Sequence, residues 1–92
     1  MPIDAATAPR AAACGPVWID GSLIAADEAR LPLLSHALQH GDAVYEGIRA
    51  YGTRLFLGHE HFRRLGRSAR RLGYTLPWRV DELLAAAAAV LW

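Results

Sequence analysis

Five arginines fall close together and are the first side chains whose type and spacing could do chemistry. They are Arg63, Arg64, Arg67, Arg70 and Arg71. Because a guanidinium group can give two parallel hydrogen bonds to a phosphate, such a group could form a phosphate or nucleic-acid patch. No aromatic residues are interleaved with the arginines, which disfavours single-strand binding. The spacing favours the solvated face of a helix and does not distinguish one arginine from the next.

The histidines and the cysteine offer weaker candidates. His59 and His61 are two apart, and residues two apart do not share a helix face, so they make a poor metal-binding pair. His36 and His40 are four apart, but no third ligand lies near them in the sequence. Cys14 is the single cysteine, and nothing beside it would activate a thiol. We therefore expect no metal site, no internal disulfide and no cysteine nucleophile.

Length and composition restrict the function classes. The 92 residues make at most one small domain, and 53% hydrophobic with 21% charged residues is typical of a globular chain. A net charge of +1 disfavours nucleic acid or an anionic membrane as a partner. No apolar run reaches the roughly 20 residues of a membrane span, and no secretory signal is present. These features predict a cytoplasmic protein.

The elements that would position these side chains begin after residue 16. Residues 1–16 are rich in alanine, lack periodicity and are expected to form a flexible tail. Residues 17–19 and 23–24 are β-prone and flank Asp20-Gly21, a pair that favours a type I′ turn because both central positions need positive φ. A hairpin is expected here, followed by one helical turn within residues 33–40.

A second hairpin and two helices complete the expected order. Residues 43–51 alternate between two faces, and Gly52-Thr53 separates them from a strand at 54–57. Apolar residues recur at helical spacing over residues 62–72, and an alanine-rich helix begins at Val80 or Asp81.

The helix ends are marked in the sequence as well. Gly73 suits a left-handed stop after the first helix. Asp81 and Glu82 fall in the first turn of the second helix, where the helix dipole favours negative charge. Two β-hairpins followed by two helices make an α+β fold. Because the sequence stops within an apolar helical stretch, residues 17–92 are expected to be one small domain that is incomplete.

One long motif resembles a known family. Residues 35–51 read Ser-His-Ala-Leu-Gln-His-Gly-Asp-Ala-Val-Tyr-Glu-Gly-Ile-Arg-Ala-Tyr. They closely resemble the N-terminal signature of the branched-chain amino-acid aminotransferases, which are fold-type-IV pyridoxal-phosphate enzymes. The resemblance covers residues 17–92, so the fold it implies is the small N-terminal domain of such an enzyme. Further matching stretches are Trp18-Ile19-Asp20-Gly21, Leu55-Phe56-Leu57, His61-Phe62-Arg63-Arg64-Leu65 and Ser68-Ala69.

The resemblance implies roles for four residues. Arg64 corresponds to the arginine that grips the phosphate of pyridoxal 5'-phosphate. Tyr45 corresponds to an aromatic residue, usually phenylalanine, that lines the substrate pocket, and Arg49 to an arginine beside that pocket on the same strand face. His40 takes a position often held by a tyrosine that reaches the pocket of the partner subunit, so a homodimer is implied. The implied substrates are an amino acid and a 2-oxo acid.

All ten residues counted as lysine or arginine are arginine, so the chain contains no lysine. Enzymes of this family bind the cofactor as a Schiff base to a lysine of a second domain, beyond residue 92 here. Arginine cannot replace it, because it stays protonated. The resemblance therefore implies a parent activity, transfer of the amino group of Leu, Ile or Val to 2-oxoglutarate, and an isolated chain with no catalytic residue.

Other functions remain open at this point. Within the superfamily, the alternatives are a D-amino-acid or amine aminotransferase and aminodeoxychorismate lyase, which share Gly41-Asp42 and Arg64-Leu65. From other classes, the alternatives are a non-enzymatic interaction module, which would bind a partner through its unfinished sheet, and a small nucleic-acid binder that uses the arginine helix. The low net charge disfavours the last of these.

Overall fold

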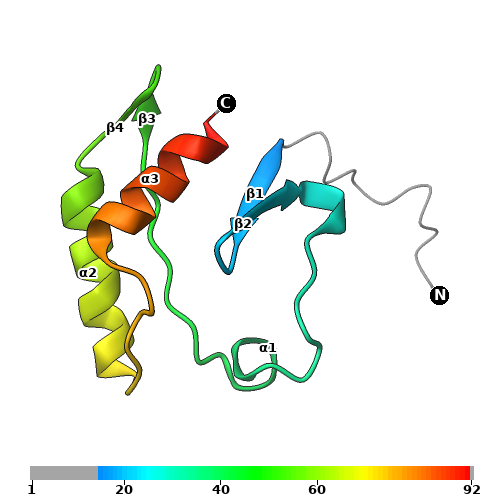
Figure 1. The fold of residues 1–92 in the computed structure, drawn as a ribbon. Helices are drawn as coiled ribbons and strands as arrows, with labels where there is room; N and C mark the ends of the chain where they lie inside the picture. Colours follow the sequence, from blue (N-terminus) through cyan, green and yellow to red (C-terminus); the bar gives the residue numbers. More distant parts are fainter. Residues whose placement is uncertain (1–14, 92) are drawn as a thin grey trace. The chain divides into compact units, whose positions relative to one another are not determined.

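The computed structural model describes residues 15–91, which form two compact units divided between Arg30 and Leu31. Most of the expected tail, together with Cys14, lies outside the described residues. Two short antiparallel hairpins precede two longer helices, so the predicted α+β fold is confirmed (Figure 1). In chain order the elements are β1 (Pro16–Ile19), β2 (Ser22–Ala25), the 3-10 turn η2 (Ala26–Glu28), α1 (His36–His40), β3 (Ala50–Tyr51), β4 (Arg54–Leu55), α2 (Gly58–Arg71) and α3 (Val80–Val90).

The first unit is built on the β1–β2 hairpin. Ile19 pairs with Ser22 across a two-residue turn made by Asp20 and Gly21. Both turn residues have positive φ, 50° and 92°, as a type I′ turn requires. The Asp-Gly pair thus formed the predicted turn at the predicted place.

The second hairpin is much shorter than predicted. Only Ala50 and Tyr51 of the expected 43–51 strand pair with β4, and the Phe56 N–H adds one hydrogen bond to the Arg49 carbonyl oxygen at 2.8 Å. The prediction of a strand over residues 43–49 was wrong. Its expected partner ends early because Leu57 turns to the left-handed region, φ 53°, and α2 begins at the next residue. Without a partner strand, residues 43–49 cannot form a ladder.

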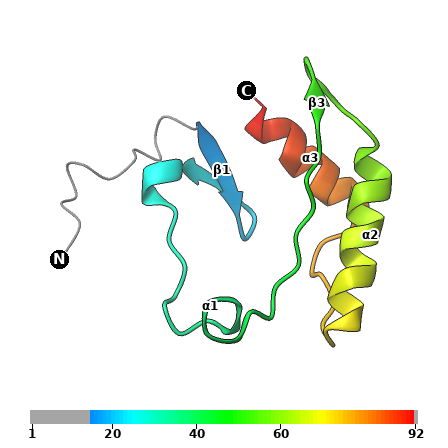
Figure 2. The same ribbon diagram turned by 180° about the vertical axis from the view of Figure 1, so that it is seen from behind.

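Residues 43–49 keep the predicted two-residue alternation even so. Val44, Glu46 and Ile48 are partly covered, whereas Tyr45 and Arg49 are exposed. Figures 1 and 2 show this segment running beside α2 toward β3. The alternation therefore reflects a segment with one side against a helix, not a strand within a sheet.

Both long helices end or begin where the sequence indicates. Gly73 has φ 93°, its N–H donates to the Arg70 carbonyl at 3.0 Å, and the Tyr74 N–H donates to the Ala69 carbonyl at 3.1 Å. This is a Schellman motif, so the predicted stop of α2 is confirmed. At the start of α3, the Glu82 carboxylate accepts from the Arg79 backbone N–H at 3.0 Å, which satisfies one N–H that the helix leaves free.

The core of the second unit is small. Helices α2 and α3 pack together, and among the described residues Ala69 is fully buried and Leu83 is 9% exposed. Large apolar side chains are exposed elsewhere in this unit; Leu34, for example, is 79% exposed. Little apolar area is thus removed from water, which makes each close contact in the unit important for its stability. No helix within residues 15–91 is long and apolar enough to cross a membrane.

The packing at the start of α2 gives a test of this structure. A Cβ added at Gly58 would lie 2.8 Å from Leu84 Cδ2 and 3.2 Å from Leu55 Cβ. The Leu84 tip can rotate away, but Leu55 Cβ moves only with β4. Overpacking costs about 1–3 kcal/mol, and alanine gains at most about 1 kcal/mol over glycine in a helix. We therefore expect Gly58→Ala to lower the free energy of unfolding in a urea titration.

Gly66 supplies the matched control on the same helix. A Cβ there meets nothing within 4 Å, so Gly66→Ala is expected to stabilise the chain by up to about 1 kcal/mol. If Gly58→Ala stabilises the chain as much as Gly66→Ala, the close packing of α2 on β4 and α3 is contradicted.

Candidate functional site

Glu46 lies at the centre of a polar cluster in the second unit. Its Oε2 accepts a hydrogen bond from Arg64 Nε at 2.8 Å, and its Oε1 accepts from Arg64 Nη2 at 2.7 Å. Oε1 also accepts from His61 Nδ1 at 2.7 Å. Since a carboxylate can only accept, His61 must carry its proton on Nδ1. The arginine contact is bidentate, the strong form of a charge-assisted pair.

The local structure explains why these three residues meet. His61 and Arg64 are three apart on α2, so they share one face of the helix. Glu46 comes from the covered side of the 43–49 segment, where its neighbours two residues away are Val44 and Ile48. A carboxylate on an otherwise apolar side is stable only when it is paired, and α2 supplies both partners.

The electrostatics of the cluster follow from the hydrogen bonds. The Arg64 guanidinium, and after it His61, lower the pKa of Glu46 from 4.5 to about 2, although burial acts in the opposite direction. The same hydrogen bond from Glu46 raises the pKa of Arg64. Glu46 and Arg64 are therefore both charged throughout the physiological pH range.

Arg64 keeps part of its guanidinium free for a ligand. The Glu46 side chain is 9% exposed and the Arg64 side chain 58%. Glu46 takes the Nε–Nη2 edge, while Nη1 makes no hydrogen bond to a described residue. Arg64 Nη2 also lies 3.3 Å from His61 Nδ1, so the two N–H groups of Nη1 are the ones that remain available to donate to a phosphate. The donor set thus fits an anion such as a cofactor phosphate.

The other residues predicted to form the site lie apart from this cluster. Tyr45 is 90% exposed and Arg49 is also exposed, both on the side of the 43–49 segment opposite to Glu46. His40 is on α1, its ring centroid 4.8 Å from that of His36. Within residues 15–91, no hydrogen bond or ion pair joins any of the three to Arg64. Their assigned roles stay predictions.

Comparisons with known proteins find aminotransferase relatives of part of this chain. No family model matches the chain. A probable branched-chain-amino-acid aminotransferase of Rickettsia typhi is 44% identical over 73 residues, which are 79% of this chain and 25% of that protein. The chain is homologous to part of a branched-chain-amino-acid aminotransferase. Proteins of that name from Salmonella typhimurium and Escherichia coli are each 35% identical over 74 residues, 76% of this chain and 24% of theirs.

These aminotransferase relatives confirm the resemblance read from residues 35–51 and do not favour the D-amino-acid aminotransferase or lyase alternatives. The chain spans about a quarter of the length of the curated relatives it matches.

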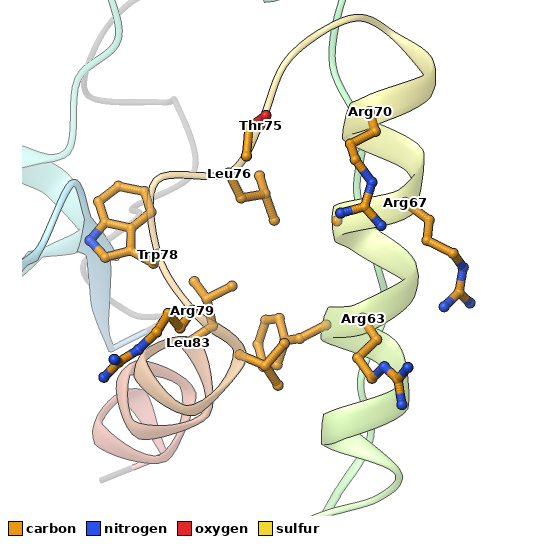
Figure 3. A pocket seen from close by; sticks show the side chains of 11 residues that line it. Arg63, Arg67, Arg70, Thr75, Leu76, Trp78, Arg79 and Leu83 are labelled. Carbon is orange, nitrogen blue, oxygen red and sulfur yellow. The ribbon is translucent and has the colours of Figure 1, made fainter.

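A cleft lies between α2 and α3, but the arginines that line it do not point to a common centre. The cleft measures about 400 Å³, with apolar walls that include Leu76, Trp78 and Leu83. Figure 3 shows the side chains of Arg63 and Arg67 directed away from the cleft. This arrangement agrees with the solvated helix face that the spacing favoured. Within residues 15–91, no group of three or more His, Cys, Asp or Glu side chains could hold a metal ion.

Glu46 and His61 were not among the residues predicted to form the site. A signal for Glu46 was present, because it is the charged residue in an alternating set whose other members are Val44, Ile48 and Ala50. A lone charge on a covered face requires a partner. His61 carried no comparable signal, since its role depends on which face of α2 meets the 43–49 segment.

Proposed function

We propose that this chain is the N-terminal part of a cytoplasmic branched-chain amino-acid aminotransferase, which transfers the amino group of Leu, Ile or Val to 2-oxoglutarate. The observation that carries the proposal is 35–44% identity to proteins of that name over about three quarters of the chain. Because those proteins are about four times as long as the matched stretch, the activity requires the rest of the enzyme.

The proposed cofactor is pyridoxal 5'-phosphate. When bound, it would supply the electron sink for amino-group transfer, and the exposed edge of Arg64 would hold its phosphate. Tyr45 and Arg49, on the opposite side of the 43–49 segment, would face the substrate. His40 on α1 would reach toward the second subunit of a homodimer. The support is the family motif for all four positions and, for Arg64, the free guanidinium edge beside Glu46.

A chimera tests the proposed activity. In it, this chain replaces the matching stretch of the Escherichia coli enzyme, and transamination of L-leucine with 2-oxoglutarate is measured. We expect turnover that depends on the chain, with no turnover when the stretch is deleted. Turnover of D-alanine in place of L-leucine would favour the D-amino-acid alternative. A folded chimera that binds cofactor and turns over neither substrate would contradict the proposal.

The isolated 92-residue chain should form no side-chain aldimine with pyridoxal 5'-phosphate. The physical reason is that the chain has no lysine, and arginine is not a nucleophile at neutral pH. After the N-terminal amine is blocked, we expect no borohydride-reducible adduct by mass spectrometry, whereas the lysine-containing chimera should form one. A reduced adduct at a defined side chain of the blocked chain would overturn this expectation.

A further inference from the structure

The side chains around Arg64 leave little freedom in how it points. Both Glu46 oxygens bind the same guanidinium edge, at 2.7 and 2.8 Å, which fixes the plane of the guanidinium as well as its position. Glu46 is itself 9% exposed, so the carboxylate that anchors Arg64 has little room to move. Glu46 therefore holds the guanidinium of Arg64 by its Nε–Nη2 edge. The Nη1 N–H groups, which make no hydrogen bond to a described residue, lie on the opposite edge, here called the outer edge.

His61 further restricts the movement of the Glu46 carboxylate. Its Nδ1–H donates to Glu46 Oε1 at 2.7 Å, and its side chain is 19% exposed. Together with Arg64 Nη2, it occupies the lone pairs of Oε1 from two directions. The carboxylate can then rotate only by losing both hydrogen bonds.

We propose that Glu46 and His61 are positioning residues that preset the outer edge of Arg64 for a phosphate group. This inference rests on the proposed function, because it takes Arg64 to be the arginine that binds the cofactor phosphate. Neither residue needs to touch the phosphate. Because the Arg64 side chain is already ordered when the protein folds, phosphate binding does not have to order it, and the affinity for phosphate is higher.

The negative charge of Glu46 also acts against phosphate binding. It repels an incoming phosphate, so removal of this charge would by itself strengthen phosphate binding. Across about 5–6 Å of water-like surroundings, repulsion between Glu46 and a phosphate of about −1.5 to −2 charges lowers affinity by roughly 6- to 16-fold without salt, and by about two- to five-fold at physiological ionic strength. Freezing the rotamers of a free arginine weakens binding by up to about 30-fold. Orientation is thus expected to outweigh repulsion, and by more at high salt than at low salt.

The test uses the 92-residue chain labelled with ¹⁵N and titrated with inorganic phosphate at constant ionic strength. The Arg64 Nε–H signal reports the order of the side chain directly, and its shift with phosphate gives Kd. For Glu46→Gln we expect faster exchange of the Nε–H and a Kd raised about three- to ten-fold, with the ratio larger at high salt. His61→Ala should also speed the Nε–H exchange and raise the Kd, but by smaller factors than Glu46→Gln.

Glu60→Gln is the matched control, because it removes one carboxylate from the first turn of the same helix, and Glu60 is exposed. It should leave the Nε–H exchange and Kd within about two-fold of the parent, since an exposed charge has little effect. Equal changes in Glu60→Gln and Glu46→Gln would mean that net charge alone acts, which overturns the proposal. A Kd lowered by Glu46→Gln at both salt levels would overturn it as well.

Arg64→Ala separates this inference from the proposed function. If Arg64→Ala leaves phosphate binding unchanged, Arg64 is not the phosphate arginine, and the proposed cofactor contact and the positioning role both fail, whereas the proposed aminotransferase activity is decided by the chimera. If Arg64→Ala weakens binding but Glu46→Gln and His61→Ala do not, the proposed function stands and the positioning role alone is refuted. Backbone signals in the same spectra show whether each variant keeps the parent fold.

Discussion

Arg64→Ala in the chimera is expected to weaken pyridoxal 5'-phosphate binding by about 10- to 150-fold, because a hydrogen bond to a charged group contributes about 1.5–3 kcal/mol. The structure leaves the outer edge of this guanidinium open, with the side chain 58% exposed. Titration of the apo chimera with cofactor, followed by the change in absorbance, gives the dissociation constant. Affinity for pyridoxal, which has no phosphate, should stay within about two-fold if Arg64 acts only on the phosphate.

Arg63→Ala and Arg67→Ala are the controls, since both residues lie on the same helix but point away from the adjacent cleft in Figure 3. Neither makes an ion pair with a described residue, and an exposed arginine contributes near zero. Equal losses at all three positions would mean that Arg64 is not the phosphate arginine. Because Arg64→Ala also leaves Glu46 without its main partner, circular dichroism must show that the variant is folded.

Elements with local signals could be predicted from the sequence. The Asp20-Gly21 turn needs positive φ at two adjacent residues, which few sequences other than Asp-Gly or Asn-Gly accept easily. Gly73 likewise marks the end of α2, because its φ of 93° is strained for any residue with a Cβ. In each case one or two residues decide the backbone conformation, so no knowledge of the tertiary structure is required.

The second hairpin shows where such signals fail. Period-two alternation over residues 43–51 predicts one face covered and one exposed, and the structure has that pattern. It does not say what covers the face. Here α2 covers it, and the possible partner strand is cut short by the left-handed Leu57. Strand pairing depends on a second segment, which periodicity in the first cannot reveal.

The candidate site likewise has a part that the sequence predicts and a part that only the structure shows. Arg64 was selected through a family motif, because helical spacing gave no reason to prefer it over Arg63 or Arg67. Its contact with Glu46 joins residues 18 apart, and the His61 contact joins residues 15 apart. Such contacts depend on how the 43–49 segment lies on α2. The structure thus adds to the motif a physical reason why Arg64 differs from its neighbours: it is the α2 arginine paired with a largely buried carboxylate.

Acidification is expected to remove the stabilisation that this pair provides. The pKa of Glu46 is about 2 in the folded chain and near the ordinary 4.5 when unfolded. A lowered folded pKa means that the unfolded state binds more protons between these values, so stability falls as pH falls. The contribution is complete above about pH 5 and is lost progressively as pH drops from 4.5 toward 2.

Urea titrations of the parent chain and of Glu46→Gln between pH 7 and pH 2 check this window. Glu46→Gln should be the less stable protein at pH 7, because glutamine cannot accept both Arg64 hydrogen bonds, and the two stabilities should converge near pH 2. Glu60→Gln removes an exposed carboxylate from the first turn of α2, where the helix dipole contributes about 0.3–1 kcal/mol at most, so its curve should stay close to that of the parent chain. A constant difference between the parent chain and Glu46→Gln from pH 7 to pH 2 would show that the carboxylate charge does not stabilise the fold, and that Arg64 is not held by the ion pair.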